Sequence, residues 1–510
     1  MSTGKVWLVG AGPSDPGLFT LKGKAVLEQA DVVVHDRLIG PGVLQMIPPA
    51  ARRIDVGKQA GNHKVVQDRI NQILLDEALA GNKVVRLKGG DPFLFGRGGE
   101  ELELLKEHGV PFEIVPGITS AVCVPAYAGI PVTHRDYTSS VHIITGHRRQ
   151  DSQTSRNEAD SQVSRAGIDY AGLAGLGDVT LIFLMGISAL PEISAGLIRE
   201  GKDPDTPAAV LERGTTAGQR RVVSTLRKLP SDALEAKIGT PGIIVVGKVC
   251  ALEEEFHWAE DRVLGTARVI ITRPREKQSG LSQKLAMLGA EVIELPSIET
   301  VPLSDKGHLD ELVFDEYQWM VFTSEAGVRY FWEYLRERRI DVRSLAHVRF
   351  AVVGSATRKA LEERGVRADY MPAVFNGKAL GEGLAGQLRE NDRVLVFAPA
   401  DTPSDCADVL RKQGFFVTSA PIYRTRYLPQ EAVELRPEDY VVFTSASTVK
   451  GFVQSMDLDD FHEVTAVCIG EKTAAEARGY QMRTVVSDEA TIASLTDKVI
   501  QLHKEKSKMI

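Results

Sequence analysis

Cysteine is scarce in this sequence: among 510 residues the four of this type are Cys123, Cys250, Cys406 and Cys468. None lies within four residues of another, and each stands in or beside an apolar stretch. This predicts reduced, partly buried thiols and argues against a disulfide or a metal site. No apolar run approaches the roughly 20 residues that would span a bilayer, and no basic segment leads into an apolar stretch near the first residue. We therefore expect a cytoplasmic protein without a membrane partner.

Positive charge is not in excess either, since the formal net charge is −7. A main nucleic-acid partner is not expected, because phosphate binding needs a basic surplus. An anionic small molecule is compatible with this charge, since a local basic cleft can lie within an acidic protein. At roughly 150 residues per domain, the length suits about three or four compact units.

Short β-rich runs alternate with helical patterns through the first part of the chain. The runs are VWLVG (6–10), DVVVHD (31–36) and KVVRLKG (83–89). Such alternation predicts an α/β fold with a mainly parallel sheet. Residues 148–166 interrupt the pattern with a polar segment, which we expect to be an exposed loop.

A second break divides the chain into two halves near residues 253–266. There the polar segments EEEF and HWAEDRVLGT precede a new strand, ARVIITRP (267–274). We therefore predict a first part at 1–255, a linker at 256–266 and a second part at 267–505.

The second half contains an internal sequence repeat. MVFTSEAGV (320–328) resembles VVFTSASTV (441–449), and FAVVGSATRKAL (350–361) resembles VCIGEKTAAEA (467–477). This repeat predicts two lobes of like design. In such pairs the ligand cleft usually lies between the lobes.

Three glycine-rich segments follow predicted strands in the first half: GAGPSDPGLFT (10–20), LKGGDPFLFGRGGEE (87–101) and PGITSAVCVPAYAGIPVTHRD (116–136). Small residues let a backbone approach a ligand closely, so the three loops together predict a ligand held largely by backbone groups. A dinucleotide site is not expected, because Asp15 stands where the third glycine of that fingerprint would be. The alternative for the first segment alone is a structural turn without a ligand.

These segments, with HDRLI (35–39), VGKQAGNHKVVQDRIN (56–71) and AYAGIPVTHRDYTSSVHIITGH (126–147), resemble uroporphyrinogen-III C-methyltransferase, a member of the tetrapyrrole methylase family. The match runs in the family's order over nearly all of residues 4–250, and Thr-His-Arg-Asp (133–136) points to the uroporphyrinogen branch. The resemblance implies the family's two-subdomain fold, a homodimer formed through this half, and S-adenosylmethionine as methyl donor. It implies no metal, flavin or nicotinamide cofactor.

The resemblance also assigns roles to matching positions. The residues implied to line the S-adenosylmethionine site are Pro13, Gly89, Gly90, Asp91, Leu94, Thr119, Ser120, Met185 and Gly214. The resemblance implies that Asp36 is the general base and that Lys58 is the proton donor. The alternatives are that Asp36 caps a turn, that Lys58 is a solvated lysine, and that Met185 is a core residue. The family commonly has glycine where this chain has Ser14, and we expect serine to be tolerated there.

The chemistry of methyl transfer accounts for these residue types. The acceptor carbon must lie about 3 Å from the methyl group, in line with the leaving sulfur, and a carboxylate base must then remove a proton. The carboxylates of the substrate need cationic partners. The candidates are Arg37, Lys58, Lys64, Arg97 and Arg135.

Residues 267–500 resemble uroporphyrinogen-III synthase through VIITRP, the two Phe-Thr-Ser segments, VVGSAT, APIYRT (420–425) and CIGEKTAAEA. The family fold implied is a pair of α/β lobes joined by two strands, here about 267–300 plus 425–505 and 301–424. Tyr423 matches the tyrosine implicated in the loss of water from hydroxymethylbilane, and the alternative is a half-buried strand tyrosine. Arg273 is a candidate partner for a substrate carboxylate. Four further candidates, which could alternatively be ordinary helix caps, are Ser324, Thr357, Ser445 and Thr473.

The two resemblances imply consecutive enzymes of one pathway. The second half would close hydroxymethylbilane to uroporphyrinogen III. The first would methylate this product twice, through precorrin-1 to precorrin-2, on the siroheme and cobalamin branch. One alternative is a methylase for another substrate. The other is a second half that binds tetrapyrrole without catalysis.

Overall fold

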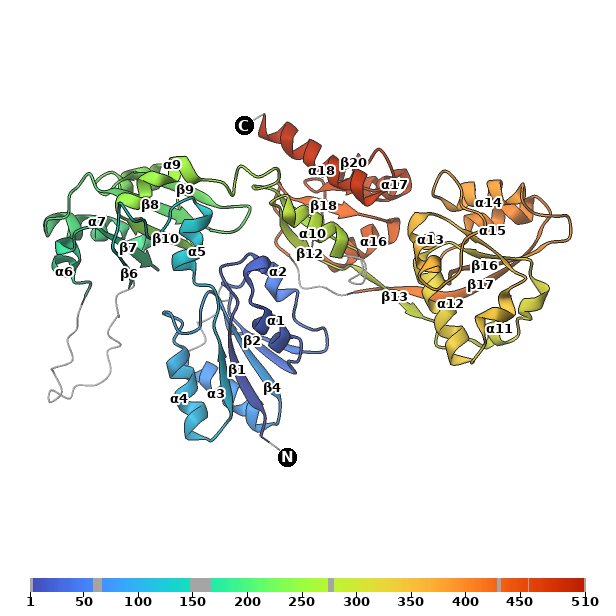
Figure 1. Ribbon diagram of the computed structural model, residues 1–510, viewed down its shortest axis with the longest axis horizontal. Coiled ribbons are helices and arrows are strands. Elements are labelled where there is room, and N and C mark those ends of the chain that lie inside the picture. Colours follow the sequence, from blue (N-terminus) through green and yellow to red (C-terminus); the bar gives the residue numbers. More distant parts are fainter. Residues whose placement is uncertain are drawn as a thin grey trace.

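The computed structural model describes residues 3–57, 67–146, 167–273, 279–428, 433–456 and 458–508. These residues form four five-stranded sheets, and Figure 1 shows helices packed against them. The predicted α/β class is confirmed. No helix in this part of the chain has both the length and the apolarity needed to cross a membrane. The predicted loop at 148–166, Lys58 and Lys64 lie outside the described residues.

The first sheet, drawn in blue in Figure 1, is parallel throughout, with the order β3-β2-β4-β1-β5. Its strands are β1 (Lys5–Gly10), β2 (Val32–His35), β3 (Arg52–Asp55), β4 (Lys83–Lys88) and β5 (Phe112–Val115). The helices of this region are α1 (Leu21–Leu27), α2 (Pro41–Leu44), α3 (Gln67–Leu79) and α4 (Gly98–Glu107). Strand β2 begins with three consecutive valines because both faces of a parallel sheet are covered, and separate apolar clusters pack on the two faces.

The second sheet, drawn in green, is mixed, with the order β6-β7-β10-β8-β9. Strands β6 and β7 are parallel and the other neighbours are antiparallel. The strands are β6 (Ser140–Thr145), β7 (Val179–Leu184), β8 (Pro207–Glu212), β9 (Arg220–Thr225) and β10 (Gly242–Val246). The helices are α5 (Ser120–Tyr127), α6 (Tyr170–Gly175), α7 (Leu190–Arg199), α8 (Leu229–Glu235) and α9 (Glu253–Phe256). Helix α5 follows the last strand of the first sheet and packs on the second, so it joins the two.

The second half of the chain forms one sheet in each of two lobes. The first lobe has a parallel sheet with the order β12-β11-β18-β19-β20. Its strands are β11 (Arg268–Ile271), β12 (Glu291–Glu294), β18 (Tyr440–Phe443), β19 (Thr465–Cys468) and β20 (Arg483–Val486). Its helices are α10 (Ser279–Met287), α16 (Ala446–Ser455), α17 (Glu471–Gly479) and α18 (Ile492–Ser507).

The second lobe has the order β13-β17-β16-β14-β15, in which only β13 and β17 pair antiparallel. Its strands are β13 (Ile298–Pro302), β14 (Trp319–Phe322), β15 (Arg349–Val352), β16 (Arg393–Pro399) and β17 (Phe416–Tyr427). Its helices are α11 (Gly307–Asp310), α12 (Glu325–Glu337), α13 (Ser355–Glu362), α14 (Gly377–Ala385) and α15 (Asp405–Lys412). The chain enters this lobe along β13 and leaves it along β17, and Figure 1 shows these strands extending between the lobes.

The internal sequence repeat corresponds to strand–helix units that occur in both lobes. Units β14–α12 and β15–α13 in the second lobe match β18–α16 and β19–α17 in the first. In each unit the strand and helix are adjacent in sequence, and the strand lies in a parallel part of its sheet. The prediction of two lobes of like design is confirmed.

Residues 256–266, predicted to be a linker, pack against both halves. The indole nitrogen of Trp258 donates to the carbonyl of Ala126 at 3.0 Å. A guanidinium nitrogen of Arg262 donates to the carbonyl of Ala286, also at 3.0 Å. The two halves are therefore held together by contacts along this segment.

Candidate active sites

Three glycine-rich loops meet at the carboxyl ends of β4, β1 and β5, which are adjacent strands of the first sheet. Gly12 and Gly90 join the first two loops through paired backbone bonds of 3.2 and 2.8 Å. Asp91 joins the second loop to the third, because its carboxylate accepts from the amide of Gly117 at 3.0 Å. Carboxyl ends of parallel strands are the usual ligand-binding edge of α/β sheets.

The loops approach so closely that only glycine fits where they meet. A Cβ on Gly117 would lie 2.2 Å from the carbonyl oxygen of Gly90, and one on Gly10 would lie 2.5 Å from the Cα of Gly117. Gly90 itself has φ +67°, and within 4 Å a Cβ there would meet only the amide nitrogen of Ser120, at 3.9 Å. The backbone at Gly90 therefore faces open space that a ligand can enter.

Residues that follow strands of the second sheet form one side of this site. The hydroxyl of Thr215 donates to the carbonyl of Pro13 at 3.0 Å. The adjacent Gly214 packs against Val124 of α5, where a Cβ would lie 2.3 Å from the valine side chain. Met185, at the end of β7, is 53% exposed, so the alternative that it is a core residue is wrong.

The contacts above link eight of the nine residues that were predicted to bind the cofactor, and the ninth, Met185, follows β7. We refer to the nine residues as the glycine-loop site. They are Pro13, Gly89, Gly90, Asp91, Leu94, Thr119, Ser120, Met185 and Gly214. Thr119 caps α5 with its hydroxyl, and Leu94 packs with α5 and β7. The site thus lies between the two sheets of the first half.

Backbone strain gathers around the same site. The residues there that are not glycine but have a positive φ are Ser14, Phe95, Arg97, Met185, Arg213 and Thr215. Such conformations cluster at functional sites, where surrounding contacts over-determine them. Ser14 has φ +128°, a region that favours glycine. Serine is therefore strained at this turn, and the expectation that it is tolerated there stays a prediction.

Ser14→Gly is expected to raise the free energy of unfolding of the first half by about 1 kcal/mol, because removing the strained Cβ outweighs the entropy that glycine adds to the unfolded chain. Differential scanning calorimetry of the full chain measures the effect. Ser304→Gly is the matched control, since Ser304 is exposed in a loop without a positive φ and should lose a few tenths of a kcal/mol. Equal losses in both variants would contradict the expected strain.

Asp36 follows the last residue of β2 and borders the glycine-loop site, since Leu38 packs against Gly89. Its Oδ1 accepts from the amide of Leu38 at 3.1 Å, so the residue does cap a turn. Its Oδ2 lies 3.8 Å from a guanidinium nitrogen of Arg86, and the side chain remains 29% exposed. The carboxylate is fixed in direction, faces a cation and is accessible, which suits a general base.

The predicted cationic partners of the substrate are unevenly placed. Arg37, next to Asp36, and Arg135 are exposed. Arg97 is exposed as well, but its Nε already donates to Glu100 at 2.9 Å. A substrate carboxylate would have to replace Glu100 to bind this guanidinium.

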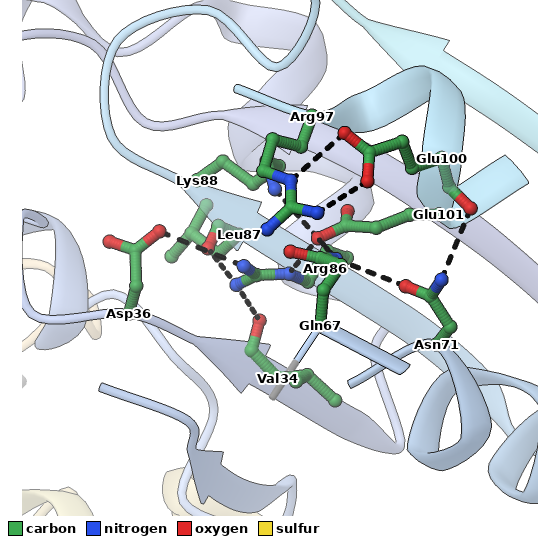
Figure 2. A network of polar contacts seen from close by, with 10 residues as sticks. All are labelled: Val34, Asp36, Gln67, Asn71, Arg86, Leu87, Lys88, Arg97, Glu100 and Glu101. Carbon is green, nitrogen blue, oxygen red and sulfur yellow. Dashed lines mark hydrogen bonds and ion pairs between the residues drawn. The ribbon is translucent and has the colours of Figure 1, made fainter. Parts of the chain in front are cut away.

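Figure 2 shows a polar cluster that the sequence patterns above do not predict. Arg86 and Lys88 stand at alternate positions of β4, and α4 places Glu101 against them. The Oε1 of Glu101 lies 2.7 Å from Nζ of Lys88 and 3.2 Å from Nε of Arg86, and all three side chains are buried. The available signal was Arg86 and Lys88 among the apolar residues that follow Lys83 in the strand KVVRLK, because such residues are rarely buried without a partner.

In the second half, four helices begin directly after parallel strands, and they carry the predicted hydroxyls. Ser324 and Ser445 are the N-caps of α12 and α16 and accept backbone hydrogen bonds, so capping does occur. Thr357 and Thr473 lie at the third positions of α13 and α17 and are 3% and 4% exposed. Both side chains are therefore buried, and their contact with a substrate carboxylate stays a prediction.

Tyr423 lies in β17, where the chain returns toward the first lobe. Its hydroxyl is 2.9 Å from Oγ of Ser324, and the residue is 6% exposed. It is therefore a buried tyrosine rather than a half-buried one. Burial raises the pKa of Tyr423, so the hydroxyl keeps its proton at neutral pH and can donate a hydrogen bond.

Charged side chains reach between the two lobes. Arg273, at the end of β11 in the first lobe, is half-buried. Burial lowers its pKa, and the charge of Glu325 in the second lobe acts in the opposite direction. Nζ of Lys472 in α17 lies 3.2 Å from the carboxylate of Asp405 in α15. The surfaces that face each other thus carry groups suited to a polycarboxylate ligand.

Comparison with known proteins gives matches to both halves. Residues 5–230 match the family model "Tetrapyrrole (Corrin/Porphyrin) Methylases", and residues 279–497 match "Uroporphyrinogen-III synthase HemD". The chain is 44% identical over 510 residues to "Porphyrin biosynthesis protein HemD" of Ruminiclostridium josui, covering 98% of this chain and 99% of that protein.

Two further relatives match the first half. "S-adenosyl-L-methionine-dependent uroporphyrinogen III methyltransferase" of Methanosarcina barkeri is 49% identical over 251 residues, which are 49% of this chain and 94% of that protein. The crystal structure of uroporphyrin-III C-methyl transferase from Thermus thermophilus, complexed with S-adenyl homocysteine, has 37% sequence identity and a TM-score of 0.39. The match covers 49% of this chain and all of that one.

Proposed function

We propose, because this chain belongs to the tetrapyrrole methylase family in its first half and to the uroporphyrinogen-III synthase family in its second, that it catalyses consecutive steps of tetrapyrrole biosynthesis. The second half closes hydroxymethylbilane to uroporphyrinogen III. The first half methylates that product twice, through precorrin-1 to precorrin-2. The observation that carries the proposal is the convergence of three glycine-rich loops beside Asp36.

The glycine-loop site fits S-adenosylmethionine, which supplies a methyl group on a positively charged sulfur. The amide of Ser120, at the start of α5, faces the open space beside Gly90 and offers a hydrogen bond to a polar atom of such a molecule. The exposed side chain of Met185 and the partly buried Leu94 offer apolar contact. These residues orient the two reactants, and orientation is a large part of what an in-line displacement needs from a protein.

Asp36 serves the step that follows displacement. The carbon–sulfur bond breaks as the carbon–carbon bond forms, and the sulfur leaves as a neutral thioether. The ring then carries a positive charge and loses a proton to the carboxylate of Asp36. Arg37, Lys64, Arg97 and Arg135 are proposed to hold the carboxylates of the ring, and Lys58 to donate a proton.

Tyr423 and Ser324 serve ring closure in the second half. The hydroxyl of Tyr423 transfers its proton to the departing hydroxyl group of hydroxymethylbilane, which leaves as water, and Tyr423 regains a proton from the pyrrole N–H as the azafulvene forms. Ser324, Ser445 and Arg273 hold substrate carboxylates at the start of α12, at the start of α16 and at the end of β11.

Tyr423→Phe is expected to lower kcat of ring closure by about 10²-fold, the low end of what a proton donor contributes. Methyl transfer to preformed uroporphyrinogen III should not change. Tyr330→Phe is a matched control, because Tyr330 is equally buried in the same lobe and its ring lies 6.0 Å from that of Tyr423. Full ring-closure activity of the Tyr423→Phe variant would contradict a direct role of Tyr423 and favour the alternative that it is a structural strand tyrosine.

The test of the whole proposal is a coupled assay. Purified protein receives freshly generated hydroxymethylbilane with and without S-adenosylmethionine, and products are identified by chromatography and mass. Uroporphyrinogen III without the methyl donor, and a dimethylated precorrin with it, are the expected results. Formation of only the type I isomer, which arises spontaneously, would contradict the synthase activity. Methyl transfer would then be tested on uroporphyrinogen III itself.

A homodimer formed through the first half is part of the proposal. Apolar side chains stand exposed on the second and third glycine-rich loops and on α5, namely Phe93, Phe95, Ile118 and Val122. Exposed apolar groups gathered in one region favour an interface. Sedimentation of the full chain tests this, and a monomer at micromolar concentration would contradict it.

A further inference from the structure

The buried cluster on β4 has one carboxylate for two cations (Figure 2). The Oε1 of Glu101 accepts from Lys88 at 2.7 Å, from Arg86 at 3.2 Å and from the side-chain amide of Gln67 at 3.2 Å. Glu101 is fully buried, and its Oε2 has no hydrogen-bond partner among the described residues. Three donors thus converge on one oxygen, which fixes the position of both cations.

The second carboxylate near this cluster is Asp36. Its Oδ2 lies 3.8 Å from Arg86, whose guanidinium also donates to the carbonyls of Val34 and Leu87. Burial and the nearby Arg86 lower the pKa of Lys88, whereas Glu101 acts in the opposite direction. Glu101 balances one positive charge, and the remaining one faces Asp36.

Other charged groups near the cluster are already engaged. His35, which precedes Asp36, is buried with Nδ1 3.4 Å from the carbonyl of Asp36. Arg97 pairs with Glu100 on the exposed side of α4. Arg37, next to Asp36 in the chain, is exposed, and Asp55 ends the neighbouring strand β3. Among the described residues, Glu101 is therefore the buried carboxylate that offsets the charge of Arg86 and Lys88.

We propose that Glu101 is a positioning residue for the proton transfer to Asp36. It holds Arg86 and Lys88 so that one net cation faces the Asp36 carboxylate and orients it for the transfer. Without Glu101, the charges of two buried cations beside Asp36 are no longer offset by a buried carboxylate. This inference rests on the proposed role of Asp36 as the base.

Glu101→Gln keeps the shape of the side chain and removes its charge. We expect kcat of methyl transfer to fall by about 10–10²-fold, as misplacement of a reacting group does. The acidic limb of the pH profile of kcat should move to lower pH, because additional positive charge favours the ionised form of Asp36. Binding of S-adenosylhomocysteine, measured by calorimetry, and ring closure by the second half should stay close to wild type.

The double variant Lys88→Met, Glu101→Gln separates charge balance from packing. It removes one cation together with the carboxylate, so it should recover kcat relative to Glu101→Gln alone and return the acidic limb toward its original pH. If Glu101 only packs, the second substitution adds to the loss instead, and the proposal is overturned. The double variant also carries the test if Glu101→Gln alone does not fold.

Glu103→Gln is the matched control, because Glu103 lies two residues further along α4 and is exposed. It should keep kcat and the pH profile. A Glu101→Gln variant with an unchanged pH profile would overturn the proposal even if its rate were lower. Failure of the base assignment is distinguishable, since full methyl transfer by an Asp36→Asn variant would refute that assignment whatever Glu101→Gln does.

Discussion

Replacing Asp36 by asparagine is expected to lower kcat of methyl transfer by about 10²–10⁴-fold, the range that general base catalysis contributes. Asparagine keeps the shape, and its Oδ1 can still accept from the amide of Leu38, so the turn after β2 persists. The negative charge that faces Arg86 at 3.8 Å is lost, and with it the proton acceptor. The measurement is transfer of a labelled methyl group to uroporphyrinogen III at saturating concentrations of both substrates.

Asp55 provides the matched control for this experiment. It ends the neighbouring strand β3, is exposed, and its Oδ1 accepts from the amide of Gly57 at 2.7 Å, in the same kind of turn. Asp55→Asn should keep methyl transfer within about twofold of wild type, as surface substitutions usually do. Ring closure should be unchanged in both variants. An Asp36→Asn protein that methylates at the wild-type rate would mean that Asp36 only caps its turn.

The meeting of the three loops could be predicted because glycine marks places where backbones approach closely. Gly10, Gly90 and Gly117 stand at or just after strand ends, and adjacent parallel strands end at one edge of a sheet. The cluster around Glu101 could not be predicted in the same way. Its contacts with Lys88 and Arg86 depend on how α4 packs on β4. Neither the helical nor the strand spacing of apolar residues specifies that packing.

At the helix starts of the second half, the sequence indicated the motif but not the direction of each hydroxyl. Ser324 and Ser445 precede their helices, and their Oγ atoms turn toward backbone amides. Thr357 and Thr473 stand three residues after their caps and fall on the buried sides of α13 and α17. Which side of a helix is covered depends on the sheet behind it, and this requires the tertiary structure.

Gly117→Ala is expected to abolish most methyl transfer, with kcat/KM falling by about 10²-fold, because a displacement of about 1 Å at a site can have that effect. The new Cβ would lie 2.2 Å from the carbonyl oxygen of Gly90 and 2.7 Å from the Cα of Gly10. Both neighbours are backbone, so no side chain can rotate away and the loops must separate. Affinity for S-adenosylhomocysteine should fall with the rate, and the first half should lose about 1–3 kcal/mol of stability.

Gly99→Ala tests whether this loss comes from the meeting of the loops or from alanine as such. Gly99 lies in α4, within the second glycine-rich segment, and a Cβ there would meet nothing within 4 Å. The substitution should stabilise the helix by about 0.5–1 kcal/mol and leave binding and methyl transfer unchanged. If Gly117→Ala instead binds S-adenosylhomocysteine as tightly as wild type, the cofactor does not depend on the contact between loops two and three. The glycines would then serve folding alone, and the site would have to be sought among the exposed cations around Asp36.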